Sequence, residues 1–222
     1  MAQPSIISRS EHRLAMGYTE WLRWSDAHPS SEWVNGEAII FMPPSIRHQQ
    51  VVGFLYSLLS WYTRMRALGI VLVAPVEMRL SAQASREPDL LFVAAQHLDR
   101  LTPQRLVGPA DLVVEVISDE SVTRDRVEKR AEYPAAGVLE YLIVDGRPEQ
   151  ASTDLLRLTT EGIYTPQRPD GVGRLHLSTL PGLWLDSDWV RADPLPDPLT
   201  CLQAIAPDAV GAALGQTGPV TG

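Results

Sequence analysis

The sequence predicts an α/β (α+β) domain in which a mixed β-sheet is flanked by helices. Through residue 146, strand-like apolar runs alternate with segments whose apolar residues recur at helical spacing. From residue 154 onward, short strand-like runs are separated by turn residues. At 222 residues, the chain suits one well-cored domain, with two domains as the alternative. We expect one domain over residues 1–190 and a loosely packed, proline-rich tail over residues 191–222.

The first expected elements are a helix, a hairpin and a long helix. The helix is expected around residues 18–28, where tryptophan and leucine supply an apolar surface. Asn35 and Gly36 lie between two strand-like runs, which is the strongest short-range signal for a β-hairpin. Over residues 45–68, apolar side chains recur at helical spacing, and Gly69 is expected to end that helix.

The middle of the chain contains four segments that are expected to be strands. These strands cover residues 70–80, 88–95, 110–118 and 139–146. A short helix is expected over residues 96–101, and a longer one over residues 121–133 that Pro134 should end. Short antiparallel strands are expected over residues 154–189.

Composition and charge limit the classes of function. The N-terminal residues lack the apolar core of a signal peptide, and no run approaches the ~18 apolar residues of a membrane span, so we expect a cytoplasmic protein without membrane association. Cys201 is the only cysteine, which fits a reducing compartment. The net charge of −8 argues against sequence-independent coating of nucleic acid. It allows an enzyme that meets one phosphodiester in a local, metal-neutralised cleft.

Glu115 is the most unusual residue of the expected strand over residues 110–118. Val113 and Ile117 share its face, and the opposite face is also apolar, so strand alternation does not direct the carboxylate to water. An unpaired buried carboxylate costs several kcal/mol. Glu115 should therefore be paired, protonated or bound to a metal. The plainer alternatives are a structural ion pair and a strand end that reaches solvent.

Asp89 follows Pro88 at the start of an expected strand. By itself, such an aspartate is usually a turn or cap residue. It gains weight from Glu115, 26 positions later (115 − 89), because neighbouring strands could bring the two carboxylates together at their ends. Two such carboxylates form a hard-oxygen site suited to Mg²⁺ or Mn²⁺.

Lys129 is the only lysine in the chain, beside eighteen arginines. Helical spacing places it on one face with Asp125 and Tyr133. The plainer interpretation is an exposed i,i+4 pair with Asp125, worth a few tenths of a kcal/mol. Arginine would serve a solvated pair equally well, whereas lysine is a compact charge that burial can tune. The lone lysine is therefore a candidate for the same site as Glu115.

Two further polar residues are candidates. Glu37 begins the second strand of the hairpin, and His48 lies in the first turn of the long helix, where the helix dipole should favour the neutral imidazole. Each alone is more often structural than catalytic. The other four histidines lack metal-ligand spacing, and the motifs of serine hydrolases, nucleotide-binding loops and zinc sites are absent.

Four stretches, taken in order, resemble the Uma-type restriction endonuclease family of the PD-(D/E)XK nuclease superfamily. They are EWVNGEAIIFMPPSIRHQ, EPDLLFV, DLVVEVISDESVTRDRVEKRAEYPAAGVLEYLIVD and LPGLWL. The resemblance covers about residues 18–190 and implies a restriction-endonuclease-like mixed sheet. Asp89 and Glu115 match the two acidic residues of the superfamily pattern. Its lysine is absent two residues later, where Ile117 stands, and Lys129 matches the lysine that this family carries on the following helix.

The resemblance implies an endonuclease that hydrolyses phosphodiester bonds of nucleic acid, DNA above all, with Mg²⁺ or Mn²⁺. Asp89, Glu115 and the backbone carbonyl of Val116 would hold the metal, and Glu37 would complete its shell or orient a water. Lys129 would stabilise developing charge or help to deprotonate the attacking water. His48 would assist from the wall of the cleft, since Glu37 and His48 match further polar positions of the family.

Nearby arginines and the competing interpretations complete the expectations. Arg124, Arg126 and Arg130 would contact phosphates. The main alternative is a catalytically silent, nuclease-like binding or scaffolding module. A hydrolase that uses two carboxylates, such as a glycosidase, is a third interpretation. A homodimer is expected by analogy with nucleases that cut both strands.

Overall fold

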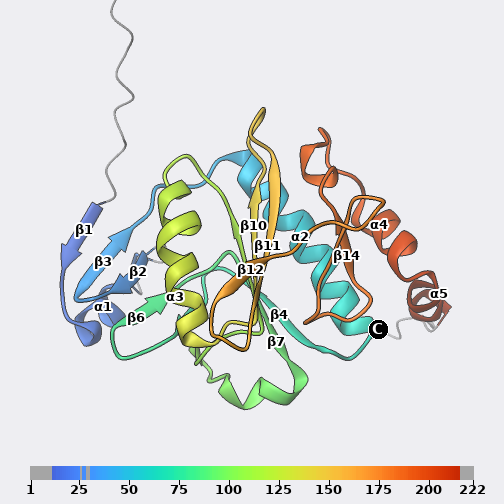
Figure 1. Cartoon of the computed structure of the whole chain (residues 1–222). Coiled ribbons are helices and arrows are strands. Elements are labelled where there is room, and N and C mark those ends of the chain that lie inside the picture. Colours follow the sequence, from blue (N-terminus) through green and yellow to red (C-terminus); the bar gives the residue numbers. More distant parts are fainter. Residues whose placement is uncertain (1–11, 26, 29–30, 216–222) are drawn as a thin grey trace, which may run out of the picture.

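The computed structural model describes residues 12–25, 27–28 and 31–215. A central sheet of six strands, in the order β12-β11-β10-β9-β7-β4, runs through the middle of the molecule (Figure 1). β9 and β10 are parallel, whereas β7 is antiparallel to β9. The strands of the central sheet are β4 (Gly69–Val73), β7 (Leu90–Ala94), β9 (Leu112–Val116), β10 (Glu140–Asp145), β11 (Ser152–Leu158) and β12 (Tyr164–Pro166).

A second six-stranded sheet, here the lateral sheet, has the order β1-β3-β2-β6-β5-β8. The predicted hairpin is its β2–β3 pair, and Asn35 and Gly36 have positive φ angles of 50° and 85°, as a tight turn of this kind requires. The strands of the lateral sheet are β1 (His12–Ala15), β2 (Ser31–Val34), β3 (Glu37–Ile40), β5 (Glu77–Arg79), β6 (Ala84–Arg86) and β8 (Arg105–Val107). The expected mixed-sheet fold class is confirmed.

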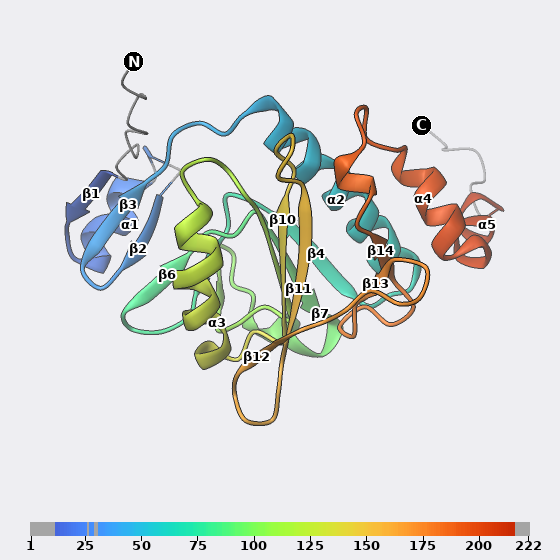
Figure 2. The ribbon, with the colours of Figure 1, turned by 45° about the horizontal axis from the view of Figure 1, so that its top comes forward.

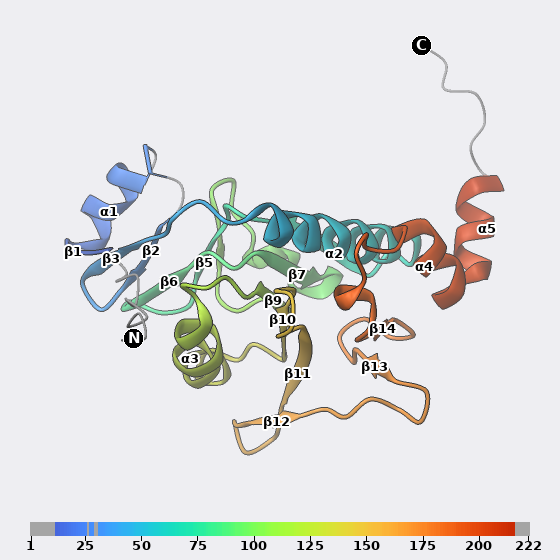
Figure 3. The same cartoon turned by 90° about the horizontal axis from the view of Figure 1, so that it is seen from above.

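Helices cover both faces of the central sheet, as Figure 3 shows: α2 (Ile46–Met65) lies on one side and α3 (Lys129–Ala136) on the other. Alternate strand residues face the two cores. Phe92 packs in the cluster that contains the buried residues of α2, here the α2 core, and Val93 packs in the cluster that contains Tyr133 of α3, here the α3 core. Every residue of β9 is buried, so neither of its faces is open to water, as the sequence predicts. Glu115 shares the α3-facing side with Val113.

The C-terminal residues differ from the loosely packed tail that the sequence predicts. Residues 198–215 form α4 (Pro198–Ile205) and α5 (Pro207–Gly215), and both helices contact α2. Leu202 and Val210 are buried in the α2 core, because apolar residues at helical spacing give each of these helices an apolar face. Figure 2 shows α4 and α5 at the end of the molecule opposite α1 (Tyr18–Ser25).

The remaining elements are short. No helix within the described ranges is long and apolar enough to cross a membrane. The short elements are the 3₁₀-helices Ala95–Arg100 and Trp189–Arg191, the strands β13 (Arg174–His176) and β14 (Trp184–Asp186), and the π-helical turn Arg124–Glu128 that precedes α3.

Two expected helix ends are wrong. α3 continues through Pro134 to Ala136, because a proline in the last turn removes one hydrogen bond only, and Gly137, at φ 91°, then ends the helix. α2 ends at Met65 rather than at Gly69. Gly69 instead begins β4, where a Cβ atom would lie 2.1 Å from the carbonyl oxygen of a residue in β7.

Candidate active site

A cleft of about 800 Å³ opens where α2 begins and where the parallel strands β9 and β10 end. The loop after β3 and the π-helical turn before α3 form further parts of its wall. Five of the six residues expected to form the metal and catalytic site line it. They are His48, Asp89, Glu115, Val116 and Lys129.

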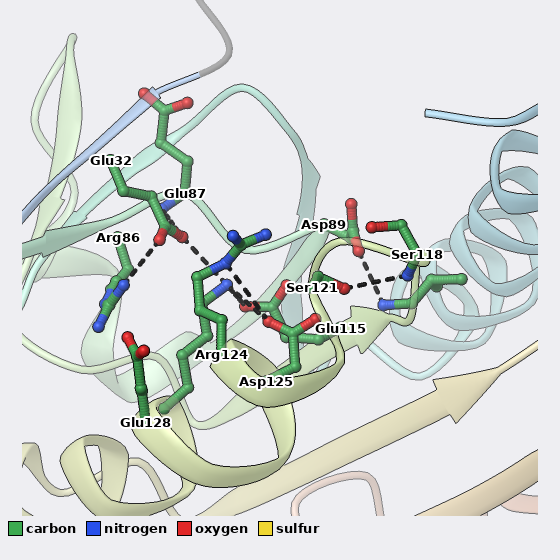
Figure 4. A network of polar contacts seen from close by, with 12 residues as sticks. Glu32, Arg86, Glu87, Asp89, Glu115, Ser118, Ser121, Arg124, Asp125 and Glu128 are labelled. Atoms are coloured by element: carbon green, nitrogen blue, oxygen red, sulfur yellow. Dashed lines mark hydrogen bonds and ion pairs between the residues drawn. The ribbon is translucent and has the colours of Figure 1, made fainter. Parts of the chain in front are cut away.

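Asp89 and Glu115 meet because their strands are antiparallel neighbours. Leu90 pairs with Val114, so Asp89, one residue earlier, stands opposite Glu115, one residue later. Asp89 Oδ2 accepts a hydrogen bond of 2.7 Å from the backbone N–H of Val116. Strand pairing thus fixes the two carboxylates side by side at the end of the central sheet, as Figure 4 shows.

Lys129 reaches the same point from α3 and is only 2% exposed. Its Nζ lies 2.7 Å from Glu115 Oε1, 3.0 Å from Glu32 Oε1 and 3.2 Å from Asp125 Oδ1. The predicted pair with Asp125 therefore exists, but it is buried rather than solvated. Tyr133, one turn further along α3, donates its hydroxyl to Glu115 Oε1 at 2.9 Å.

The electrostatics of this cluster follow from burial and from the balance of charges. Burial raises the pKa of Glu115 to about 8, and Asp125, Asp89 and Glu32 add to the effect against the opposing influence of Lys129. Burial acts in the same direction on Glu32, but Lys129 and Arg86 outweigh it and hold the pKa of Glu32 well below its usual range. Burial lowers the pKa of Lys129, but its three carboxylate neighbours outweigh burial, and the pKa of Lys129 is raised.

His48 faces Asp89 from the first turn of α2, with Nε2 at 3.4 Å from Asp89 Oδ2. From the sequence, the helix dipole is expected to favour the neutral ring. The structure corrects this expectation: burial lowers the pKa of His48, but Asp89 and the carbonyl of Val116 outweigh burial, and the pKa is raised. A charged imidazole would therefore hold the Asp89 carboxylate from the side opposite α3.

Glu37 is not brought to the cleft. Its side chain is 45% exposed and pairs with Arg13 at 3.5 Å. Glu32, on the other strand of the same hairpin, takes the place expected for Glu37, because β2 runs between β3 and β6 and points its carboxylate at Lys129. Arg86 on β6 holds the second oxygen of Glu32 at 2.8 Å.

Sequence reasoning missed Glu32 and Glu87. Burial, followed by the charges of Glu32 and Glu77, raises the pKa of Glu87 to about 8, and Glu87 lines the cleft. One available signal was that Glu87 lies two residues before Asp89, since alternate strand positions share a side. Glu32 gave no signal, because nothing in the sequence sets it apart from Glu37 in the same hairpin.

The donor set fits a hard divalent cation. Among the described residues, no hydrogen bond engages Glu115 Oε2 or Asp89 Oδ1, since Lys129 and Tyr133 bind Oε1 and Val116 binds Oδ2. No group of three His, Cys, Asp or Glu side chains in the described ranges has a metal-binding arrangement. The available side-chain ligands are thus two carboxylates, and Mg²⁺, an ion that keeps several waters, is often held by one or two carboxylates.

Comparison with known proteins identifies the family. Residues 18–188 match the Uma2 family, described as "Putative restriction endonuclease". The crystal structure of a protein from Anabaena variabilis, described as "a putative nuclease belonging to DUF820", has a TM-score of 0.64 at 14% identity, over 79% of this chain and 97% of that chain, and so shares the fold. No curated protein matches the sequence. Because the family match covers more than half of the chain and every residue of the cleft, the chain belongs to the Uma2 family.

Proposed function

We propose that the protein is a metal-dependent endonuclease that hydrolyses phosphodiester bonds of DNA. One observation carries the proposal: Asp89 and Glu115, from neighbouring strands, meet Lys129, from the following helix, in one cleft. Membership in the restriction endonuclease family supports the same chemistry.

The proposed metal ligands are Asp89, Glu115 and the carbonyl of Val116. Hard oxygen donors favour Mg²⁺ or Mn²⁺, and Mg²⁺ often takes one or two carboxylates together with substrate phosphate and water. When bound, such an ion polarises the phosphate and lowers the pKa of a coordinated water. Glu37 has no part in this set, because its side chain lies outside the cleft.

The protein's own side chains place charge around the reacting phosphate. Three carboxylates keep Lys129 protonated, so it can stabilise negative charge that develops in the transition state. The same contacts argue against Lys129 as the base that deprotonates water. His48 orients Asp89 from the opposite wall.

A second candidate function is a nuclease-like binding module without catalysis. The observation that favours it is the tight enclosure of Lys129, which is equally the signature of a structural ion cluster. The two candidates differ in whether the cleft binds a metal and supports turnover.

Calorimetric titration with Mg²⁺ tests the metal set. We expect Asp89→Asn to abolish binding and Glu37→Gln to bind as the wild type does, since the latter removes an equal charge outside the cleft. Equal binding by wild type and Asp89→Asn would overturn the ligand assignment. Cleavage of supercoiled DNA, linear DNA, single-stranded DNA and RNA, each with Mg²⁺ or Mn²⁺, then tests the substrate, and cleavage of RNA alone would replace DNA in the proposal.

Two further features belong to the same proposal. A homodimer would supply two clefts for the two strands of a duplex, and light scattering in solution measures the mass directly. A cytoplasmic location fits the single, buried Cys201. Labelling the protein in cells and fractionating them tests that location.

A further inference from the structure

The helix that carries Lys129 begins with a π-helical turn, Arg124–Glu128. The backbone N–H of Lys129 donates to the carbonyl of Arg124 rather than to that of Asp125. This hydrogen bond sets residue 129 one turn above residue 124, on the same side of the helix. In an α-helix, five steps of ~100° would turn the two side chains about 140° apart. π-helical turns are rare in proteins, and those that do occur often lie at functional sites.

The turn brings Arg124 to the cleft on an aromatic support. The Cζ atom of Arg124 lies 4.3 Å from the ring centroid of Phe41, a cation–π contact. Both residues line the cleft, as does Lys129. The Arg124 side chain is largely buried, and Figure 4 shows it between Glu32 and Asp125. A guanidinium that is already fixed on a ring loses little freedom when it binds a ligand.

The two arginines that follow in the sequence point elsewhere. Arg126 donates to Asp154 at 2.7 Å and to Ser152 at 3.0 Å, both on β11. Arg130 is exposed, and neither of these arginines belongs to the lining of the cleft. The phosphate contacts expected of three arginines therefore fall to Arg124 alone.

We propose that Arg124 is a second substrate-contacting cation, which binds the phosphodiester beside Lys129. This assignment rests on the proposed function. Lys129 is enclosed by three carboxylates, so a phosphate that binds beside it needs a further cation to offset their negative charge. The planar fork of arginine matches two phosphate oxygens at once. The π-helical turn is the device that presents both cations to one ligand.

The test separates a phosphate contact from a purely structural role through the salt dependence of binding. Fluorescence anisotropy measures the affinity for a labelled DNA single strand of about 12 nucleotides, in EDTA and over a range of NaCl concentrations. Each lost phosphate contact lowers the slope of log K against log[NaCl] by about 0.7 for a single strand. We expect this fall for Arg124→Gln and an unchanged slope for Arg126→Gln and Arg130→Gln, which remove the same charge from the same helical segment. An unchanged slope in Arg124→Gln overturns the proposal.

A charge-conserving variant covers the case in which Arg124→Gln does not fold. Arg124→Lys keeps the charge beside the buried carboxylates but lacks the fork, so we expect kcat for Mg²⁺-dependent cleavage to fall at least about tenfold with the melting temperature retained. Wild-type kcat in Arg124→Lys overturns the proposal. Suppose that the wild type binds the strand and that Arg124→Gln shows the expected fall in the salt slope, but that neither the wild type nor any variant cleaves DNA. The Arg124 contact then stands and the nuclease function fails. If the wild type cleaves and Arg124→Gln is unaffected, only the Arg124 contact fails.

Discussion

Lys129→Arg is the most informative single substitution, because it keeps the charge and changes only its shape. Nζ of Lys129 has carboxylate oxygens at 2.7, 3.0 and 3.2 Å, and the side chain is 2% exposed. A guanidinium is wider and longer than an ammonium, so it fits only if the Glu115 carboxylate moves. Glu115 is a proposed metal ligand, and the cost therefore falls on catalysis as well as on stability.

The size of both effects follows from this geometry. Overpacking a buried site costs about 1–3 kcal/mol, which corresponds to a melting temperature lower by roughly 2–12 °C for a chain of this length. Displacing one preorganised charge from a transition state lowers kcat by about 10²-fold or more. We expect a folded protein with a lower melting temperature and a much larger loss of cleavage.

The assay is Mg²⁺-dependent cleavage of DNA, with melting measured by circular dichroism on the same sample. Arg130→Lys is the matched control, since it is the reverse exchange at the exposed neighbouring position and should change stability by less than about 0.5 kcal/mol. Wild-type cleavage by Lys129→Arg would refute the reasoning, because charge alone would then suffice at this position.

Three further predictions concern stability and reactivity. Glu32→Gln leaves Arg86 and Lys129 without the carboxylate that they share, so urea titration should show a free energy of unfolding lower by about 3 kcal/mol. The same titration of the exposed control Glu37→Gln should show almost no change in that free energy. Because burial raises the pKa of Cys201 to about 11, iodoacetamide should alkylate the folded protein at pH 8 only as fast as α4 detaches, and rapid alkylation would contradict the packing of that helix. Gly69→Ala should lower the melting temperature, since its Cβ would strike the β7 backbone. Gly53→Ala on α2 should raise the melting temperature, because alanine lowers the entropy of the unfolded chain and meets no neighbour here. Equal shifts in the two variants would contradict this account.

Much of the framework could be predicted from the sequence because local signals agreed with the fold. The Asn35–Gly36 turn requires positive φ angles, and few other residue pairs tolerate them. Two apolar faces around Glu115 required a buried carboxylate with a partner, and the structure supplies Lys129 and Tyr133. These features depend on neighbours in sequence or on burial alone.

The features that the sequence did not predict depend on contacts between distant segments. Glu32 and Glu37 look equivalent in one hairpin, and only the pairing of β2 with β6 turns Glu32 toward Lys129. The π-helical turn changes which arginine faces the cleft without any special residue to mark it. The sequence predicts a loosely packed tail over residues 191–222, yet α4 and α5 form there because α2 offers them an apolar surface.

The most direct test of the central claim compares the initial rates at which wild type and Glu115→Gln cleave supercoiled plasmid in Mg²⁺. Glutamine keeps the shape of the side chain and its hydrogen bonds within the cluster but removes the charged ligand. A site built from Asp89, Glu115 and Lys129 predicts cleavage by the wild type, its loss in EDTA and a fall of at least about 10²-fold in Glu115→Gln. Equal rates for the two proteins, or no cleavage by a folded wild type that binds Mg²⁺, would contradict the claim.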